Sequence, residues 1–148
     1  MPRILNNSFR EQVRRNAVAL ISVFIAVSSL SYNTWRNELT EYNRNQRLVS
    51  IQVLLKLEEL QELVFYNHYD HDTQSKGNPR SGWAIVLTIR DLAQILEQPL
   101  PESATALYSV WNSNWSDLGK PGDAGAGAIL ESIQDIRDDT LALLQMLD

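Results

Sequence analysis

The apolar stretch from Ala17 to Trp35 constrains this chain more than any other feature. It reads AVALISVFIAVSSLSYNTW and is the only long apolar run in the sequence. As a helix, its uninterrupted part from Ala17 to Leu30 would be roughly 21 Å long, and extension to Trp35 gives about 28 Å. The hydrocarbon core of a bilayer is about 30 Å thick. We therefore predict a transmembrane anchor over residues 13–35.

The residues at the two ends of this stretch suit the two faces of a membrane. Tyr32 and Trp35 are aromatic residues of the kind found at membrane surfaces, and Arg14 and Arg15 mark the opposite surface. Only one acid, Glu11, accompanies the arginines before the stretch. The positive-inside rule then predicts a cytoplasmic tail over residues 1–12. We expect a single-pass protein of a bacterial inner membrane, with its C-terminal domain in the periplasm.

Two other interpretations of the stretch remain open. A signal peptide would have similar basic residues before the apolar run, and cleavage after Ser31 would place Ser29 at the −3 position. Runs of this length also occur in buried helices of soluble proteins. A bacterial lipoprotein anchor, in contrast, is excluded because the sequence has no cysteine.

Composition and motifs exclude several classes of function. The lack of cysteine rules out disulfides and thiolate metal sites, and the net charge of −5 argues against a nucleic-acid surface. The glycines form no phosphate-binding loop, and no serine lies in a recognisable nucleophile motif. We therefore predict a protein that is not an enzyme and needs no cofactor. Its expected partners are the lipid bilayer and either another membrane protein or a second copy of the chain.

Apolar residues recur every three or four positions through most of the chain, and no alternating strand pattern appears. This spacing predicts helices over 10–70, 83–98, 101–118 and 124–147, with Ser81 as the N-cap of the second. Gly and Pro clusters separate them. We predict an all-α fold in which one N-terminal transmembrane helix is continuous with the first, longest helix of an antiparallel up-down four-helix bundle. The bundle is assigned to residues 50–148.

The first predicted helix is much longer than the others, so its membrane-proximal part, residues 36–49, is predicted to be a helical stalk. Trp35, Leu39, Tyr42, Gln46 and Val49 form one stripe along it at helical spacing. Partly polar stripes of this kind occur in coiled coils, so we predict that these residues bind a partner chain. The alternative is a hydrated, weakly apolar stripe.

Both histidines of the chain lie in a short polar cluster that contains His68, Asp70, His71 and Asp72. Residues three apart share one face of a helix, so these side chains are a candidate Zn²⁺ or Cu²⁺ site. The alternative is a helix C-terminus, where histidines interact well with the helix dipole and aspartates favour the following turn.

A second cluster consists of Tyr108, Trp111 and Trp115, which recur at helical spacing. Such a stripe either belongs to the hydrophobic core or lines an apolar ligand pocket. The sequence alone favours the core.

Two classes of function fit these features. The first is a membrane-anchored accessory, assembly or scaffold subunit that docks onto a partner or onto itself. The alternative is a membrane-anchored sensory or ligand-binding bundle, with metal as one candidate ligand, that signals through a partner. In its layout, an N-terminal span followed by a helical domain, the chain resembles the input domains of chemoreceptors and sensor kinases. Those receptors return through a second span, for which this sequence has no candidate after residue 36.

Overall fold

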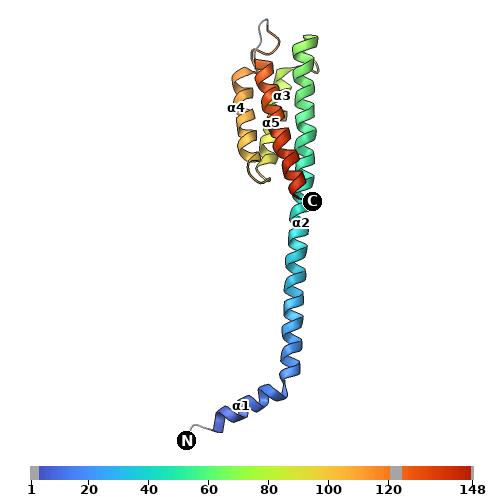
Figure 1. Cartoon of the computed structure of the whole chain (residues 1–148). Helices are drawn as coiled ribbons and strands as arrows, with labels where there is room; N and C mark the ends of the chain where they lie inside the picture. Colours follow the sequence, from blue (N-terminus) through green and yellow to red (C-terminus); the bar gives the residue numbers. More distant parts are fainter. Residues whose placement is uncertain (1–3, 121–124, 148) are drawn as a thin grey trace. The chain divides into compact units, whose positions relative to one another are not determined.

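The computed structural model of the chain describes residues 4–120 and 125–147. Its regular secondary structure is all helical, with no strand among those residues, so the all-α prediction is confirmed there. Figure 1 shows the five helices, which are α1 (Ile4–Arg15), α2 (Ala17–Asp70), α3 (Pro79–Ala93), α4 (Leu100–Asn114) and α5 (Gly125–Met146).

The chain divides into two compact units, Met1–Tyr42 and Asn43–Asp148. The first unit holds α1 and the beginning of α2. The sequence predicted a single helix from about residue 10, whereas helix already begins at Ile4 and is interrupted at Asn16, so the predicted tail over residues 1–12 overlaps α1. Hydrogen bonding continues across the interruption, since the Asn16 N–H donates to the Gln12 carbonyl and the Leu20 N–H donates to the Asn16 carbonyl, both at 3.0 Å.

In the described part of the chain, α2 is the one helix that is long and apolar enough to cross a membrane. Its most apolar 18-residue window has a mean hydropathy of 1.6, and none of that window is buried within the protein. Length and composition are the basis of this finding, and a signal sequence near the N-terminus shares both. The exposed apolar side chains of this segment include Val18, Leu20, Ile21, Val23, Phe24, Ile25, Val27 and Leu30.

The second unit is built around one hydrophobic core. It contains the C-terminal part of α2 together with α3, α4 and α5, which lie alongside it (Figure 1). Helix α3 packs on α4, and α4 packs on α5. Apolar residues that continue along α2 at the same helical spacing after Val49 supply its contribution to the core. Val53, Leu57, Leu60 and Val64 are fully buried.

The start of α3 differs from the prediction. Asn78, rather than Ser81, is the N-cap, and its side-chain oxygen accepts a hydrogen bond from the Arg80 N–H at 3.0 Å. Pro79 occupies the first turn, where its fixed φ is favourable and its missing N–H costs nothing. Ser81 therefore lies inside the helix. The helix also ends at Ala93 instead of Gln98.

The close approach of α3 to α4 depends on a glycine. Trp111 of α4 is fully buried, and its ring lies against Gly82 of α3. A Cβ atom at position 82 would lie 2.2 Å from Cζ2 of Trp111, well inside van der Waals contact. Gly82 thus creates the space that the largest core side chain fills.

Candidate functional site

The five residues of the predicted partner-binding stripe are divided between the two compact units. Trp35, Leu39 and Tyr42 belong to the first unit and are 62%, 49% and 44% exposed. Gln46 and Val49 belong to the second unit. Gln46 is buried, and its Nε2 donates a hydrogen bond to the Ile95 carbonyl at 2.9 Å. Val49 is half-buried against the core.

Three members of this stripe stay exposed, namely Trp35 at the end of the predicted anchor and Leu39 and Tyr42 on the predicted stalk, and we call them the stalk triad. The boundary between the compact units falls after Tyr42, inside the stalk predicted over 36–49. Helix α2 already joins the core of its own chain from Gln46 onward, with Ser50 and Val53 also buried. Of the five residues in the predicted stripe, the three of the stalk triad are therefore the ones whose side chains stay exposed to a partner.

The predicted membrane-interface residues lie in the first unit. The rings of Tyr32 and Trp35 are 6.2 Å apart, tilted by 53°, and both side chains are exposed. Arg14 and Arg15 are exposed and form the basic last turn of α1, directly before the interruption at Asn16. Aromatic and basic residues therefore flank the apolar segment of α2 in the order that the sequence indicated.

The predicted metal cluster lies at the C-terminal end of α2. His68 is half-buried, with its ring edge-on to Tyr69 at 4.8 Å, and Asp70 is the last residue of the helix. His71 then adopts a positive φ of 54°, and the Asp72 N–H donates to the Tyr66 carbonyl at 3.1 Å. The chain thus leaves the helix within the cluster itself.

The carboxylate of Asp72 organises the loop after α2. It accepts backbone hydrogen bonds from the N–H groups of Ser75 at 2.8 Å, Lys76 at 2.9 Å and Gln74 at 3.1 Å. The bond from Ser75, followed by the other backbone bonds, lowers the pKa of Asp72 below its ordinary value against a smaller opposing effect of desolvation. Within residues 4–120 and 125–147, no group of three or more His, Cys, Asp or Glu side chains could hold a metal ion. The metal site stays a prediction.

Sequence reasoning missed a buried asparagine beside this cluster. Asn67 is completely buried on α2, and its Nδ2 donates to the Gly77 carbonyl at 2.7 Å. Two glycines allow backbone to approach it. A Cβ on Gly77 would lie 2.5 Å from the backbone nitrogen of Asn67. A Cβ on Gly119, whose φ is +78°, would lie 2.6 Å from the side-chain Oδ1 of Asn67. Asn67 therefore joins two loops to the end of α2, and the glycines in both loops were the available signal.

The aromatic stripe on α4 belongs to the core. Trp111 is fully buried, while Tyr108 and Trp115 are half-buried and pack against the core. Trp83 of α3 makes edge contacts with all three rings, at centroid distances of 5.7 Å to Tyr108, 6.5 Å to Trp111 and 6.0 Å to Trp115. The stripe therefore packs in the core, which is the alternative to a ligand pocket that the sequence favoured.

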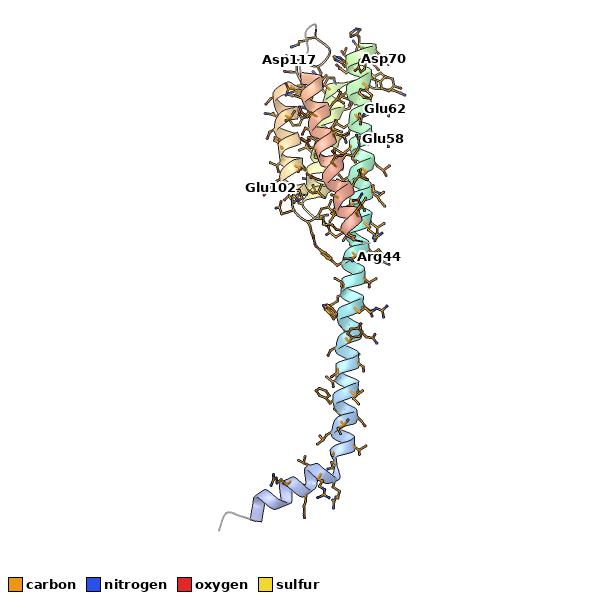
Figure 2. All side chains as sticks on the ribbon, viewed as in Figure 1. Arg44, Glu58, Glu62, Asp70, Glu102 and Asp117 are labelled. Carbon is orange, nitrogen blue, oxygen red and sulfur yellow. The ribbon has the colours of Figure 1, made fainter. Side chains whose placement is uncertain are left out.

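A surface groove between α2 and α5 was not predicted. We call it the α2/α5 groove, and its volume is about 800 Å³. Two acids, Glu58 and Glu62, lie among its apolar side chains, and Figure 2 shows both on α2. The lining residues are Ile51, Leu54, Leu55, Glu58, Gln61, Glu62, Phe65, Arg137 and Leu141. The acids made this face of α2 look fully solvated in the sequence.

Compared with known proteins, the chain matches no family model, no curated protein and no solved structure. The fold and surfaces define the class only as an all-helical protein, over the residues described, with one candidate membrane-spanning helix.

Proposed function

We propose that this chain is a non-enzymatic single-pass membrane protein that acts as an accessory, assembly or scaffold subunit. The first part of α2 would anchor it in a bacterial inner membrane, with α1 on the cytoplasmic side and the second unit in the periplasm. The helical domain would be an antiparallel up-down four-helix bundle. The short connections between its helices and the packing of α3 on α4 and α4 on α5 support that arrangement.

One observation carries this proposal, namely the exposed apolar side chains that follow one another along α2 from Val18 to Leu30. Water is a poor environment for such a surface, because full burial of one large apolar side chain is worth about 1.5–3 kcal/mol. A bilayer would cover the predicted anchor over residues 13–35, with Trp35 at its surface. Leu39 and Tyr42 of the stalk triad continue the exposed apolar surface beyond the anchor and favour a protein partner.

Disulfide crosslinking in native membranes tests the docking role. The natural chain has no cysteine, so single substitutions give an unambiguous result. We expect Leu39→Cys and Tyr42→Cys to form a crosslinked dimer or a crosslink to a cysteine-bearing partner, and the matched control Glu41→Cys to form none. Monomer alone from both triad variants, or equal crosslinking by all three, would rule out the triad as the docking surface.

The predicted orientation has its own test. A maleimide that cannot cross the inner membrane should label Ser109→Cys on α4 in spheroplasts and should leave Gln12→Cys on α1 unlabelled until the membrane is opened. The opposite pattern would reverse the orientation, and labelling of both sites in intact spheroplasts would refute a membrane-spanning α2.

A ligand-binding role is the second candidate, because the α2/α5 groove has a volume within the range of small-molecule sites. Such sites bury most of their ligand, whereas Ile51 and Leu55 in the groove remain 47% and 53% exposed. The groove is therefore better suited to an extended protein surface than to a small molecule.

A further inference from the structure

We propose that the α2/α5 groove binds an amphipathic helix of a different protein, one that places Lys or Arg side chains opposite Glu58 and Glu62. This inference extends the proposed docking function from the stalk to the helical domain. It depends on a separate surface, so the stalk triad and the groove can fail independently.

Helix α2 has a second apolar stripe besides the one that faces the core. Counted from Leu48, successive members are separated alternately by three and four residues, which is the spacing of a helix-pairing seam. The members of this outer stripe are Leu48, Ile51, Leu55, Glu58, Glu62, Phe65 and Tyr69, and all of them are exposed. A helix that is already buried on one face therefore offers a second face suited to pairing with another helix.

The dimensions of the groove suit one helix. From Ile51 to Phe65 the floor on α2 extends for about 21 Å, or roughly four helical turns. Leu141 lines the groove from α5, and the half-buried Leu54 lines it from α2. Helices that bind in grooves of this kind insert apolar side chains at i, i+3, i+4 and i+7. A partner segment of about 14 residues would fill the length.

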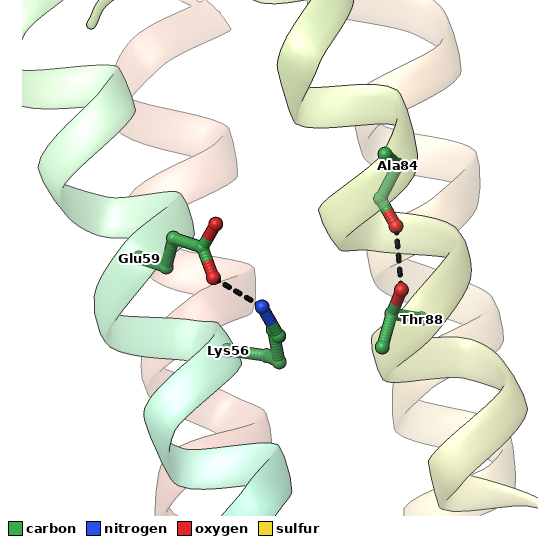
Figure 3. A network of polar contacts seen from close by, with 4 residues as sticks. All are labelled: Lys56, Glu59, Ala84 and Thr88. Atoms are coloured by element: carbon green, nitrogen blue, oxygen red, sulfur yellow. Dashed lines mark hydrogen bonds and ion pairs between the residues drawn. The ribbon is translucent and has the colours of Figure 1, made fainter.

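The charges in the groove select a basic partner. Glu58 makes no hydrogen bond or ion pair with any residue in the described part of the chain, whereas the adjacent Glu59 is paired with Lys56 (Figure 3). The one cation lining the groove, Arg137, donates instead to the side-chain oxygens of Gln61 and Gln134. As a whole, with the groove included, residues 43–148 contain fifteen acidic and eight basic residues.

The end of the outer stripe already binds a cation from the same chain. The ammonium of Lys76 lies 4.7 Å from the centre of the Tyr66 ring and 3.9 Å from Oε1 of Glu62, and it donates to the Tyr66 hydroxyl at 3.1 Å. Glu62, Phe65, Tyr66, Tyr69 and Asp70 line a second hollow of about 350 Å³ there, which shares Glu62 and Phe65 with the groove. Acids and aromatic rings together favour Lys and Arg side chains.

A second copy of this chain is a poor occupant. Two copies anchored in one membrane in the same orientation would pair their α2 helices in parallel. The outer stripes would then bring Glu58 opposite Glu58 and Glu62 opposite Glu62. Like charges at facing positions destabilise such a pair. The groove therefore favours a partner of a different sequence.

Selection from a displayed peptide library tests the proposal on the full chain in nanodiscs. The probe is a 16-residue helical library with Leu, Ile or Phe fixed at i, i+3, i+4 and i+7 and with Lys, Arg, Glu, Gln or Ala elsewhere. We expect the selected peptides to be enriched in Lys and Arg. Their Kd should rise about tenfold or more with Glu58→Lys/Glu62→Lys, and salt should weaken binding.

Matched variants keep the result specific to the groove. Glu131→Lys on α5, an exposed charge reversal outside the groove, should leave the Kd unchanged, as should Leu39→Ser in the stalk triad. Leu55→Ser should weaken binding without loss of helical content by circular dichroism. The proposal is overturned if no peptide is enriched, if acidic peptides are enriched, or if Glu131→Lys acts as strongly as the groove variant. Dimerisation of the full chain that depends on Leu55 would instead assign the groove to a second copy.

Discussion

Trp111 of α4 occupies the space that a side chain on Gly82 of α3 would need, since a Cβ there would lie 2.2 Å from Cζ2 of Trp111. The substitution Gly82→Ala should therefore destabilise the helical domain, because a buried indole cannot shift without disturbing its neighbours. Overpacking of this kind costs about 1–3 kcal/mol. Urea unfolding of the full chain in detergent, followed by circular dichroism, measures the change.

Gly127→Ala in α5 is the matched control. A Cβ at position 127 would meet no atom within 4 Å, and the site is helical and exposed. The same chemical change should here stabilise the protein by up to about 1 kcal/mol, because alanine is the better helix former. Equal effects at the two positions would show that Trp111 does not lie against Gly82.

Asn67→Ala should destabilise the domain by about 1–3 kcal/mol, because the Gly77 carbonyl would lose its buried hydrogen-bond donor. Asn112→Ala, on the exposed face of α4, changes the same group in water and should have little effect. Hydrogen exchange would localise the change to the loops that contain Gly77 and Gly119. An Asn67→Ala variant as stable as the wild type would contradict the buried contact.

Gln46→Ala tests whether Gln46 stabilises the chain's own core or belongs to the predicted partner-binding stripe. Because its Nε2 donates to the Ile95 carbonyl, we expect a loss of about 1–3 kcal/mol in the free energy of unfolding. The crosslinking yield of Leu39→Cys should not change. The exposed Gln52→Ala on the same helix serves as the control. Unchanged stability together with reduced crosslinking would instead show that Gln46 belongs to the partner-binding stripe.

The Asp72 loop should be sensitive to acid. Backbone donors, Ser75 first, hold the pKa of Asp72 below its ordinary value of 3.8, so the folded state favours the carboxylate. This stabilisation is fully present above pH 3.8 and is lost as the pH falls through the lower pKa of the folded state. The protection factors of the Gln74, Ser75 and Lys76 amides, which correct for the intrinsic pH dependence of exchange, should fall over that acid range. Asp72→Asn should remove this pH dependence, whereas Asp70→Asn should behave as the wild type.

Zn²⁺ and Cu²⁺ test the metal prediction directly. Because Asp72 is engaged by three backbone amides and no set of three ligands lies together in the described part of the chain, we expect no rise in Tm with either ion. If Tm instead rises by several degrees with either ion, and His71→Ala abolishes that rise, the predicted metal site is supported. EDTA should likewise leave the Tm of the purified protein unchanged.

The sequence predicted the helices well because burial in this domain follows helical periodicity. The stripe from Val53 to Val64 on α2 and the stripe from Ile129 to Ile136 on α5 are buried as their spacing indicated. The start of α3 was misplaced because Asn78 and Pro79 serve equally well as turn residues and as a helix start. The same two residues are favourable in a turn and at a helix N-terminus, so only the packing of α3 in the folded domain decides between the two structures.

The candidate sites were harder to predict, since they depend on which polar residues the fold buries. The sequence assigned Gln46 to a partner-binding stripe and gave Asn67 no role, yet each donates a hydrogen bond to a backbone carbonyl inside the domain. The outer stripe of α2 was hidden for the opposite reason, because Glu58 and Glu62 interrupt its apolar members. One periodic pattern of apolar residues marks one face of a helix, whereas α2 has both a buried face in the core and an exposed outer stripe.

The exposed hydroxyl groups of α4 have a practical consequence. Thr105, Ser109 and Ser113 donate to the carbonyls of Pro101, Thr105 and Ser109, each four residues earlier, as Thr88 does to Ala84 on α3 (Figure 3). These hydroxyls are satisfied by their own helix and, among the residues described, bond to no neighbouring element. A fluorophore or biotin attached at Ser109 would therefore leave the α2/α5 groove, which is lined by residues of α2 and α5, untouched. The exposed face of α4 is the natural handle for imaging this protein or capturing its complexes.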